Sequence, residues 1–181
     1  MISILFNGSV VMMLCRRIAA GDWCHVFPEG GIWQRPELGG RENGTEGELG
    51  KLKWGVGKLI AHSPKRAIVI PFFQFGMETT MPQHPVTKKL DTVIPRPGHD
   101  VTVRFGKEID FDDLIKEHEA IHGALWKYTA SVDEDVYPGG GKEGGKEGDF
   151  HDHWDSRPEE LMLYHKIALR IEESLNCLNK R

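Results

Sequence analysis

An unbroken apolar run from Ala67 to Phe73 constrains the fold of this chain more than any other segment. Without a polar side chain, neither face of such a strand suits water, so a strand here needs cover on both sides. That cover comes from helices packed on the two faces of a sheet. We therefore expect a layered fold that contains both helices and strands.

Helical and extended patterns alternate along the rest of the chain. Helices are favoured where apolar residues recur every three or four positions, and strands where β-branched and aromatic residues cluster between turns. These patterns predict a helix over 10–20 ending at Gly21, a short, mostly buried strand over 23–27, a helix near 49–60, a half-buried strand over 101–105, and a helix from Phe111 toward Trp126 that Asp110 caps. Their order predicts an α/β layer fold, a sheet flanked by helices.

Two glycine-rich stretches separate these elements. Residues 30–50 show little apolar periodicity and predict an irregular surface excursion, and residues 131–155 predict a flexible linker rich in glycine and acidic side chains. We divide the chain into a divergent N-terminal helix (1–20), a main domain (21–130), the linker (131–155) and a C-terminal amphipathic helix (156–181). A capping box from Ser156 to Glu159 is expected to start that last helix.

Composition excludes several functional classes. Of 181 residues, 39% are hydrophobic and 28% charged, as in ordinary globular proteins. A net charge of −4 provides no general positive field, so nucleic acid is not an expected partner. The apolar stretch from Met1 to Cys15 is shorter than the ~20 residues of a membrane-spanning helix, so only shallow membrane contact stays open. Three cysteines without a C-x-x-C pair predict neither a disulfide framework nor structural zinc.

A bend that carries a carboxylate follows the first predicted strand, in the sequence Phe27-Pro28-Glu29-Gly30. Proline and glycine hold such a turn open, and ligands of α/β sheets usually bind at strand ends. A carboxylate there can accept hydrogen bonds from ligand hydroxyls or hold a cation near an anionic group. Spacing alone favours an ordinary turn.

Together with its neighbours, this bend resembles the F-P-E-G block of the glycerophospholipid acyltransferase family, and Gly21-Asp22-Trp23 before it is similar to the tafazzin branch of that family. Further blocks that resemble the family follow in order at 52–61, 70–82 and 103–107. The resemblance covers about residues 21–114. Several ordered blocks are far more specific than one four-letter motif.

The resemblance implies transfer of a fatty acyl group between glycerophospholipids and lysophospholipids, such as cardiolipin remodelling, with no cofactor and no metal. It assigns Phe27, Pro28, Glu29 and Gly30 to binding of the acceptor's glycerophosphate part, with Pro71 lining the same region. A membrane-associated, mitochondrial location is also implied, although we see no targeting signal at this N-terminus. Neither the residues nor the resemblance fixes an oligomeric state.

The reaction centre of that family is not found in this sequence. The family uses a histidine as general base and an aspartate five positions later that orients it. None of the nine histidines is followed by aspartate at that distance. We therefore predict that the chain lacks the catalytic N-terminal part, supplies the acceptor-binding half with no catalytic residue, and is inactive alone. A non-enzymatic lipid-binding or partner-binding remnant is the alternative.

Two histidine motifs suggest metal binding. Residues 118–122 match the H-E-x-x-H pattern of zinc hydrolases on a predicted helix, but no third ligand follows in a well-formed element. Solvated surface histidines are therefore favoured. The His-Asp-His sequence at 151–153 lies in the predicted linker and is interpreted as solvated.

A local basic surface is predicted in the segment that follows the first glycine-rich stretch. Residues 51–66 contain no acid and carry Lys51, Lys53, Lys58, Lys65 and Arg66. Such a surface can meet anionic lipid head groups, and a merely solvated helix face explains it equally well.

Overall fold

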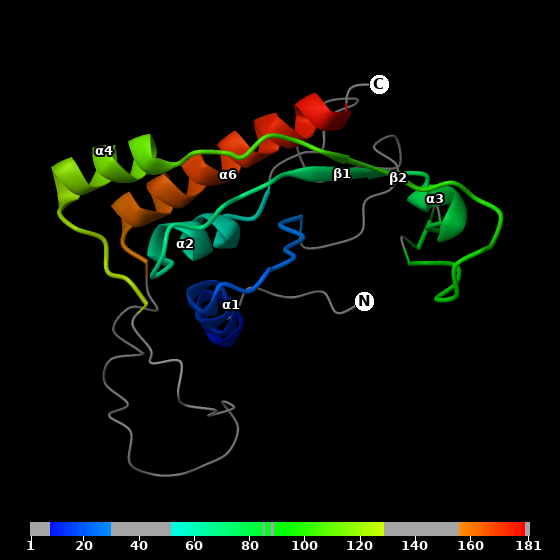
Figure 1. Ribbon diagram of the computed structural model, residues 1–181, viewed down its shortest axis with the longest axis horizontal. Coiled ribbons are helices and arrows are strands. Elements are labelled where there is room, and N and C mark those ends of the chain that lie inside the picture. The colour runs from blue at the N-terminus through cyan, green and yellow to red at the C-terminus, as the bar shows by residue number, and fades with distance from the viewer. Residues whose placement is uncertain (1–7, 30–51, 85, 88, 129–155, 180–181) are drawn as a thin grey trace, which may run out of the picture. The chain divides into compact units, whose positions relative to one another are not determined.

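The computed structural model of the chain describes residues 8–29, 52–84, 86–87, 89–128 and 156–179 (Figure 1). Along them lie α1 (Gly8–Ala20), α2 (Gly55–His62), β1 (Phe72–Phe75), α3 (Met77–Thr80), β2 (Thr102–Phe105), α4 (Asp112–His122) and α6 (Pro158–Asn179). Helix and strand are thus mixed, as an α/β class requires. The predicted excursion at 30–50 and the predicted linker at 131–155 lie outside the described residues.

The chain forms two compact units that interleave along the sequence. The first comprises Met1–Pro28, Trp54–Ala67 and Phe111–Ile167, and the second Glu29–Lys53, Ile68–Asp110 and Ala168–Arg181. The domain boundaries expected from composition stay a prediction.

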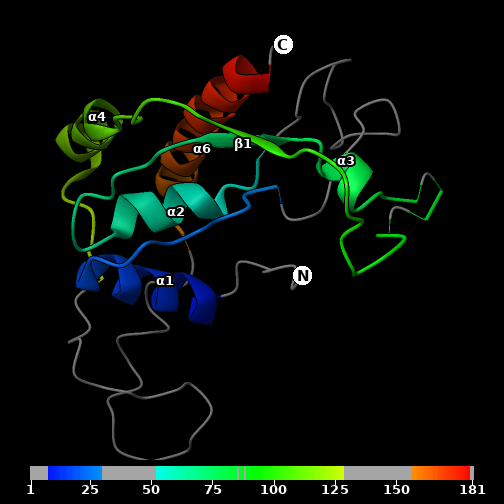
Figure 2. The same cartoon turned by 45° about the vertical axis from the view of Figure 1, so that its right-hand side comes forward.

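A small apolar core between α1 and α2 organises the first unit. Val11, Leu14 and Cys15 on one face of α1 are buried with Leu59 of α2, at the three- and four-residue spacing of an amphipathic helix. Figure 2 shows these two helices side by side. The first predicted helix is confirmed, and it ends where Gly21 takes a φ of 88°, a conformation that glycine adopts easily.

The predicted strand over 23–27 is wrong. Its side chains do alternate between buried and exposed positions. Cys24 and Val26 pack against the α1–α2 core, and the three residues between and beside them are exposed: Trp23, His25 and Phe27. Trp23 is 97% exposed, so the segment is not mostly buried. Aromatic and β-branched residues favour a strand only where a neighbouring strand completes the hydrogen bonds, and no described strand pairs with this segment.

α2 begins later than predicted. Leu52, which was expected within the helix, lies before it and is buried, and its backbone N–H donates to the Glu172 carboxylate at 3.2 Å. The helix stops at His62, directly before Ser63-Pro64, because the residue before a proline avoids the helical conformation.

α2 approaches the backbone of α6 closely. A Cβ atom at Gly57 would lie 2.4 Å from the carbonyl oxygen and 2.6 Å from the Cα of Tyr164. Only glycine leaves room for this approach.

The second unit contains a two-stranded antiparallel sheet. Phe72 of β1 lies opposite Phe105 of β2, and an isolated bridge between Val69 and Ile109 extends the pairing. Arg104 of β2 donates to the carbonyl oxygen of Leu178 on α6 at 2.8 Å. The sheet therefore meets the C-terminal part of α6 on one side.

The strands differ from the sequence prediction in length and burial. The apolar run at 67–73 forms a regular strand only from Phe72 onward, and burial on both faces is wrong because Ile68 and Ile70 are exposed. The strand predicted at 101–105 is confirmed as β2, but all four of its residues are exposed instead of half-buried. Among the described residues, β1 and β2 are the two strands that form a sheet.

α4 is shorter than the helix predicted there. It begins at Asp112, and its N-cap residue is Phe111 without a side-chain cap bond, so the predicted cap by Asp110 is wrong. It ends at His122 because Gly123 takes a φ of 88°, before Trp126 is reached.

The predicted C-terminal helix is confirmed as α6. Its capping interaction is shifted by one residue, because Glu160 and not Glu159 accepts the backbone N–H of Arg157, at 3.2 Å. Pro158 in the first turn fits the sequence expectation. Among the described helices, none combines the length and the apolar character needed to cross a bilayer.

Candidate functional site

The predicted acceptor-binding bend is described as far as Glu29, and Gly30 lies outside the described residues. Pro28 and Glu29 form a turn directly after the alternating segment. The Phe27 ring is 49% exposed, and Glu29 is partly buried. The bend thus carries an exposed ring and an anionic hydrogen-bond acceptor within three residues.

Pro71, the remaining predicted binding residue, is buried in the second unit. Its carbonyl oxygen accepts the Gly106 N–H at 2.8 Å. Phe27 and Pro28 belong to the first unit, and Glu29 and Pro71 to the second. A binding role for these residues stays a prediction.

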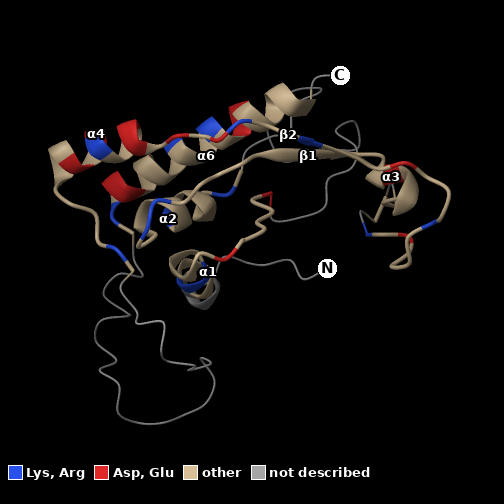
Figure 3. Cartoon of the chain, in the orientation of Figure 1, with Lys and Arg blue, Asp and Glu red and all other residues tan. Residues whose placement is uncertain are grey.

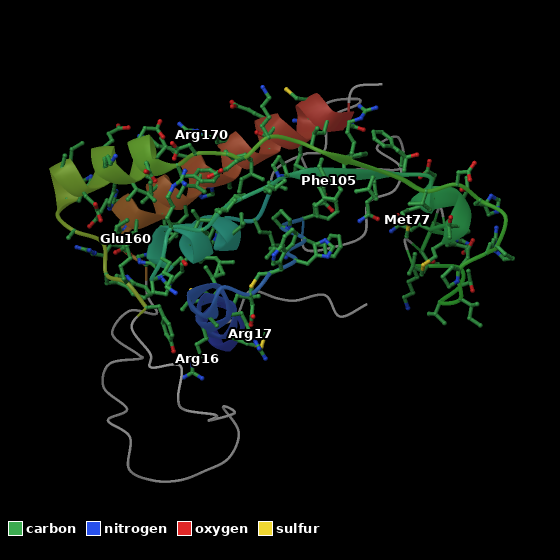
Figure 4. The ribbon with its side chains drawn as sticks, viewed as in Figure 1. Arg16, Arg17, Met77, Phe105, Glu160 and Arg170 are labelled. Carbon is green, nitrogen blue, oxygen red and sulfur yellow. The ribbon has the colours of Figure 1, made fainter. Side chains whose placement is uncertain are left out.

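A buried polar cluster that the sequence did not reveal lies in the first unit. His62 is 0% exposed; its Nδ1 lies 2.8 Å from the carbonyl oxygen of Trp126 and its Nε2 lies 2.5 Å from the Tyr164 hydroxyl. The Tyr164 hydroxyl also lies 3.4 Å from the Glu160 carboxylate, which Arg157 holds at 3.1 Å. We call these five residues the His62 cluster (Figure 4 labels Glu160).

The geometry fixes the protons of the His62 cluster. A carbonyl oxygen only accepts, so Nδ1–H of His62 donates to Trp126, and the neutral ring then accepts the Tyr164 O–H at Nε2. Burial lowers the pKa of His62 to about 4, against smaller opposing effects of the Trp126 hydrogen bond and the Glu160 charge. Burial also raises the pKa of Tyr164. At neutral pH both side chains are therefore uncharged.

The Glu160 carboxylate forms an ion pair with Arg157 at the edge of this cluster. Burial alone would raise its pKa, but hydrogen bonds from the Arg157 side chain and backbone outweigh burial and lower it. An ionised Glu160 bonded to Arg157 is the form that this geometry favours.

The two rings at the centre of the His62 cluster, His62 and Tyr164, have no exposed surface. Because burial lowers the pKa of His62 to about 4, its ring is a weak base at neutral pH and lies out of reach of solvent. Its partners lie 64 and 102 residues away in sequence, so no local motif signals the cluster.

The H-E-x-x-H segment lies on α4. The rings of His118 and His122 have centroids 4.8 Å apart, and Glu119 accepts the backbone N–H of Leu125 at 3.1 Å. His118 is buried, so the expectation of solvated histidines is wrong for that residue. Burial lowers the pKa of His118, and the nearby charge of His122 lowers it further. Within the described part of the chain, no group of three or more His, Cys, Asp or Glu side chains could hold a metal ion. Residues 151–153 lie outside that part.

The predicted basic surface at 51–66 is partly wrong. Lys58 is 5% exposed and donates to the Ser156 hydroxyl at 3.1 Å, so its charge is not on the surface. Arg66 pairs with Asp112 at 3.2 Å, and Lys65 donates to a backbone carbonyl of α1. Lys51 lies outside the described residues.

The chain is similar to curated proteins from three organisms. It is 35% identical to tafazzin of Drosophila melanogaster over 103 residues, which are 56% of this chain and 23% of that protein. It is 33% identical over 97 residues to an N-acylphosphatidylethanolamine synthase of Arabidopsis thaliana, 54% of this chain and 30% of the synthase. Taffazin of Dictyostelium discoideum is 32% identical over 106 residues, 56% of this chain and 31% of that protein.

The matched part of the chain covers less than a third of the length of each of these relatives. No family model matches the chain, and no solved structure matches it significantly. The recognition that rested on the ordered motifs is nevertheless confirmed: over about half of its length, this chain resembles the tafazzins and an N-acylphosphatidylethanolamine synthase.

Proposed function

We propose that this chain is part of a phospholipid acyltransferase of the tafazzin type and binds the lysophospholipid acceptor. The observation that carries the proposal is the 32–35% identity to two tafazzins and to a synthase of an acylated phospholipid. The substrate is a glycerophospholipid, such as cardiolipin, and its lysophospholipid. The mixed helix and strand are compatible with the layer fold of such enzymes, which we include in the proposal.

The bend at 27–30 contacts the acceptor in this proposal. Glu29 accepts a hydrogen bond from a glycerol hydroxyl, and the exposed Phe27 ring packs against the glycerol backbone and the start of the acyl chain. Pro71 stays in the proposal as a buried residue that shapes the same region.

The 181-residue chain alone does not catalyse the transfer. None of its nine histidines has aspartate five positions later, and His62 is fully buried with a pKa lowered to about 4. Binding without turnover is therefore the expected behaviour of this polypeptide. The proposed location is a mitochondrial membrane, on the resemblance to tafazzin alone.

Calorimetric titration with lysophosphatidylcholine tests the binding role. Replacement of Glu29 with Gln weakens binding about tenfold, because a hydrogen bond to a charged acceptor is lost. Glu173→Gln, on the exposed face of α6, serves as the matched control and leaves binding unchanged. Equal binding by both variants contradicts the role of the bend.

Two further measurements separate the enzymatic role from the alternative, a lipid-binding remnant. An acceptor site discriminates against a lysophospholipid analogue that lacks the free hydroxyl, because a buried polar partner is then left unsatisfied, whereas a remnant that holds only the acyl chain binds both equally. Acyl transfer is measured on the purified chain with a lysophospholipid and a diacyl phospholipid donor. Turnover above background contradicts the prediction that the chain is inactive alone.

A further inference from the structure

The two histidines of the H-E-x-x-H segment share one face of α4, close to its C-terminal end. We propose that His118 and His122 together bind one divalent transition-metal ion such as Zn²⁺. Because the described part of the chain holds no group of three or more potential ligands, water molecules supply the remaining positions around the ion. The site lies beyond residue 114, where the resemblance to the acyltransferases ends, so it is independent of the proposed acyl transfer.

The geometry of the two rings allows them to reach one ion. Residues four apart on a helix have Cβ atoms about 5 to 6 Å apart on the same face. A zinc–nitrogen bond is about 2.0 to 2.1 Å long, and tetrahedral coordination therefore separates two nitrogen ligands by about 3.3 Å. The ring centroids of His118 and His122 lie 4.8 Å apart with planes inclined by 39°. Rotation of the two side chains gives the required separation, and α4 does not need to unwind.

Both imidazoles have the accessible nitrogen atoms that a metal ligand needs. Neither ring forms a hydrogen bond with another described residue. His122 is exposed, and His118 keeps 8% of its surface. In the described part of the chain, the fully buried side-chain polar atoms without a partner are Arg16 Nε and Ser63 Oγ. The ring nitrogens of His118 are not among them and therefore reach solvent.

The charges at the start of α6 favour a cation beside these rings. Glu159, Glu160 and Arg157 all act electrostatically on His118. Arg157 pairs with Glu159 at 3.7 Å and with Glu160 at 3.1 Å, so two negative charges face one positive charge. Figure 3 shows these acidic side chains in the first turn of α6, on the side of α4. The balance of charge near His118 is therefore negative.

The donor set selects the class of ion. Imidazole nitrogens suit zinc, nickel and copper, whereas Mg²⁺ and Ca²⁺ prefer oxygen ligands. Glu119, at the position of the general base in zinc hydrolases, accepts the backbone N–H of Leu125 at 3.1 Å. This carboxylate is thus engaged by the segment that follows α4. The role that fits the site is structural, because an ion held by His118 and His122 joins adjacent turns at the end of the helix.

Calorimetric titration of the full 181-residue chain with zinc chloride tests the proposal. We expect a site with a micromolar dissociation constant and no binding of magnesium chloride. His122→Gln, a change at an exposed position, weakens zinc binding at least tenfold because one of the two protein ligands is lost. His165→Gln, on the exposed side of α6, serves as the matched control and leaves zinc binding unchanged.

Two double variants separate this pair from the other histidines. Ala120→His combined with His122→Gln keeps nine histidines but places two of them two residues apart, on different sides of the helix, so zinc binding is lost. His151→Gln combined with His153→Gln removes the other histidine motif and retains zinc binding at α4. Circular dichroism verifies that every variant is folded.

Electron paramagnetic resonance with Cu²⁺ gives a direct readout of the ligands. Cu²⁺ occupies nitrogen sites more tightly than Zn²⁺, so it serves as the spectroscopic probe. We expect the spectrum to report two imidazole nitrogens in the unchanged chain and one in His122→Gln.

Three results overturn the proposal. Equal zinc affinity of His122→Gln and the unchanged chain shows that the pair does not hold the ion. Loss of zinc binding in the variant changed at 151 and 153 assigns the ion to that motif. Retained zinc binding in the variant changed at 120 and 122 shows that the spacing on α4 is irrelevant. None of these results bears on lysophospholipid binding at Glu29, so failure here and failure of the acceptor site are distinguishable.

Discussion

The His62 cluster and the β1–β2 sheet place large side chains in opposite surroundings. In the first unit, His62 and Tyr164 are fully buried, and the polar atoms that bring them together have partners. In the second unit, Phe105 is 67% exposed, and the whole of β2 is on the surface. From this difference in burial we expect stability to depend more on the His62 cluster than on the exposed strand β2.

Replacement of His62 is expected to cause the largest loss in the free energy of unfolding. His62→Ala leaves a cavity and also strips the Trp126 carbonyl and the Tyr164 hydroxyl of their partner, so we expect a loss of about 4 kcal/mol in the free energy of unfolding. Tyr164→Phe, which removes only the hydroxyl, costs about 1 to 2 kcal/mol. Urea unfolding at pH 7 measures both.

The control for His62→Ala is His165→Ala on the exposed side of α6, which changes stability by less than about 0.5 kcal/mol. Equal losses at His62 and His165 would show that the cluster does not stabilise the first unit.

Acidification loosens the first unit selectively. The pKa of His62 is about 4 in the folded chain and 6.5 in its unfolded reference, so the unfolded state binds more protons between these values. Stability is full above about pH 6.5 and falls as the pH drops toward 4, by about 3 kcal/mol in all. The lowered pKa of Glu160 adds a further loss below its ordinary value.

Urea midpoints between pH 7 and pH 4 measure this slope. His62→Ala serves as the comparison, because it cannot titrate at position 62 and loses most of the slope between pH 6.5 and 4. An equal slope in the unchanged chain and in His62→Ala is the contrary outcome.

The smallest effect is expected at the sheet surface. Phe105→Thr introduces a β-branched residue, which strands favour, at an exposed position and changes stability by less than about 0.5 kcal/mol. Ile109→Ala, at a buried position of the same unit, costs about 3 kcal/mol. Thermal unfolding of the two variants gives the contrast, and a large loss on Phe105→Thr would mean that the exposed face is covered in solution.

Patterns within one element were predictable from the sequence. The helical spacing in α6 and the apolar face of α1 specify those helices because each depends on residues three or four apart. Gly21 and Ser63-Pro64 mark helix ends by local backbone preference.

Features that depend on distant neighbours could not be predicted in the same way. Trp23 is a residue type that strands favour, but a strand also needs a hydrogen-bonding partner strand from elsewhere in the chain. Lysine is usually a surface residue, yet Lys58 is buried and donates a hydrogen bond to Ser156, which is 98 residues away in the sequence. Of the candidate site, the sequence could predict the turn at Pro28-Glu29, but no local signal pointed to the His62 cluster.

The close approach at Gly57 has a consequence for sequence variation. Every replacement of glycine adds at least a Cβ atom, and the nearest obstacle is the rigid main chain at Tyr164. A saturation screen for folded protein would thus report position 57 as being as intolerant as an active-site residue, and packing alone is enough to explain it. Such intolerance reflects the short distance between the backbones of α2 and α6, which leaves no space for any side chain at position 57.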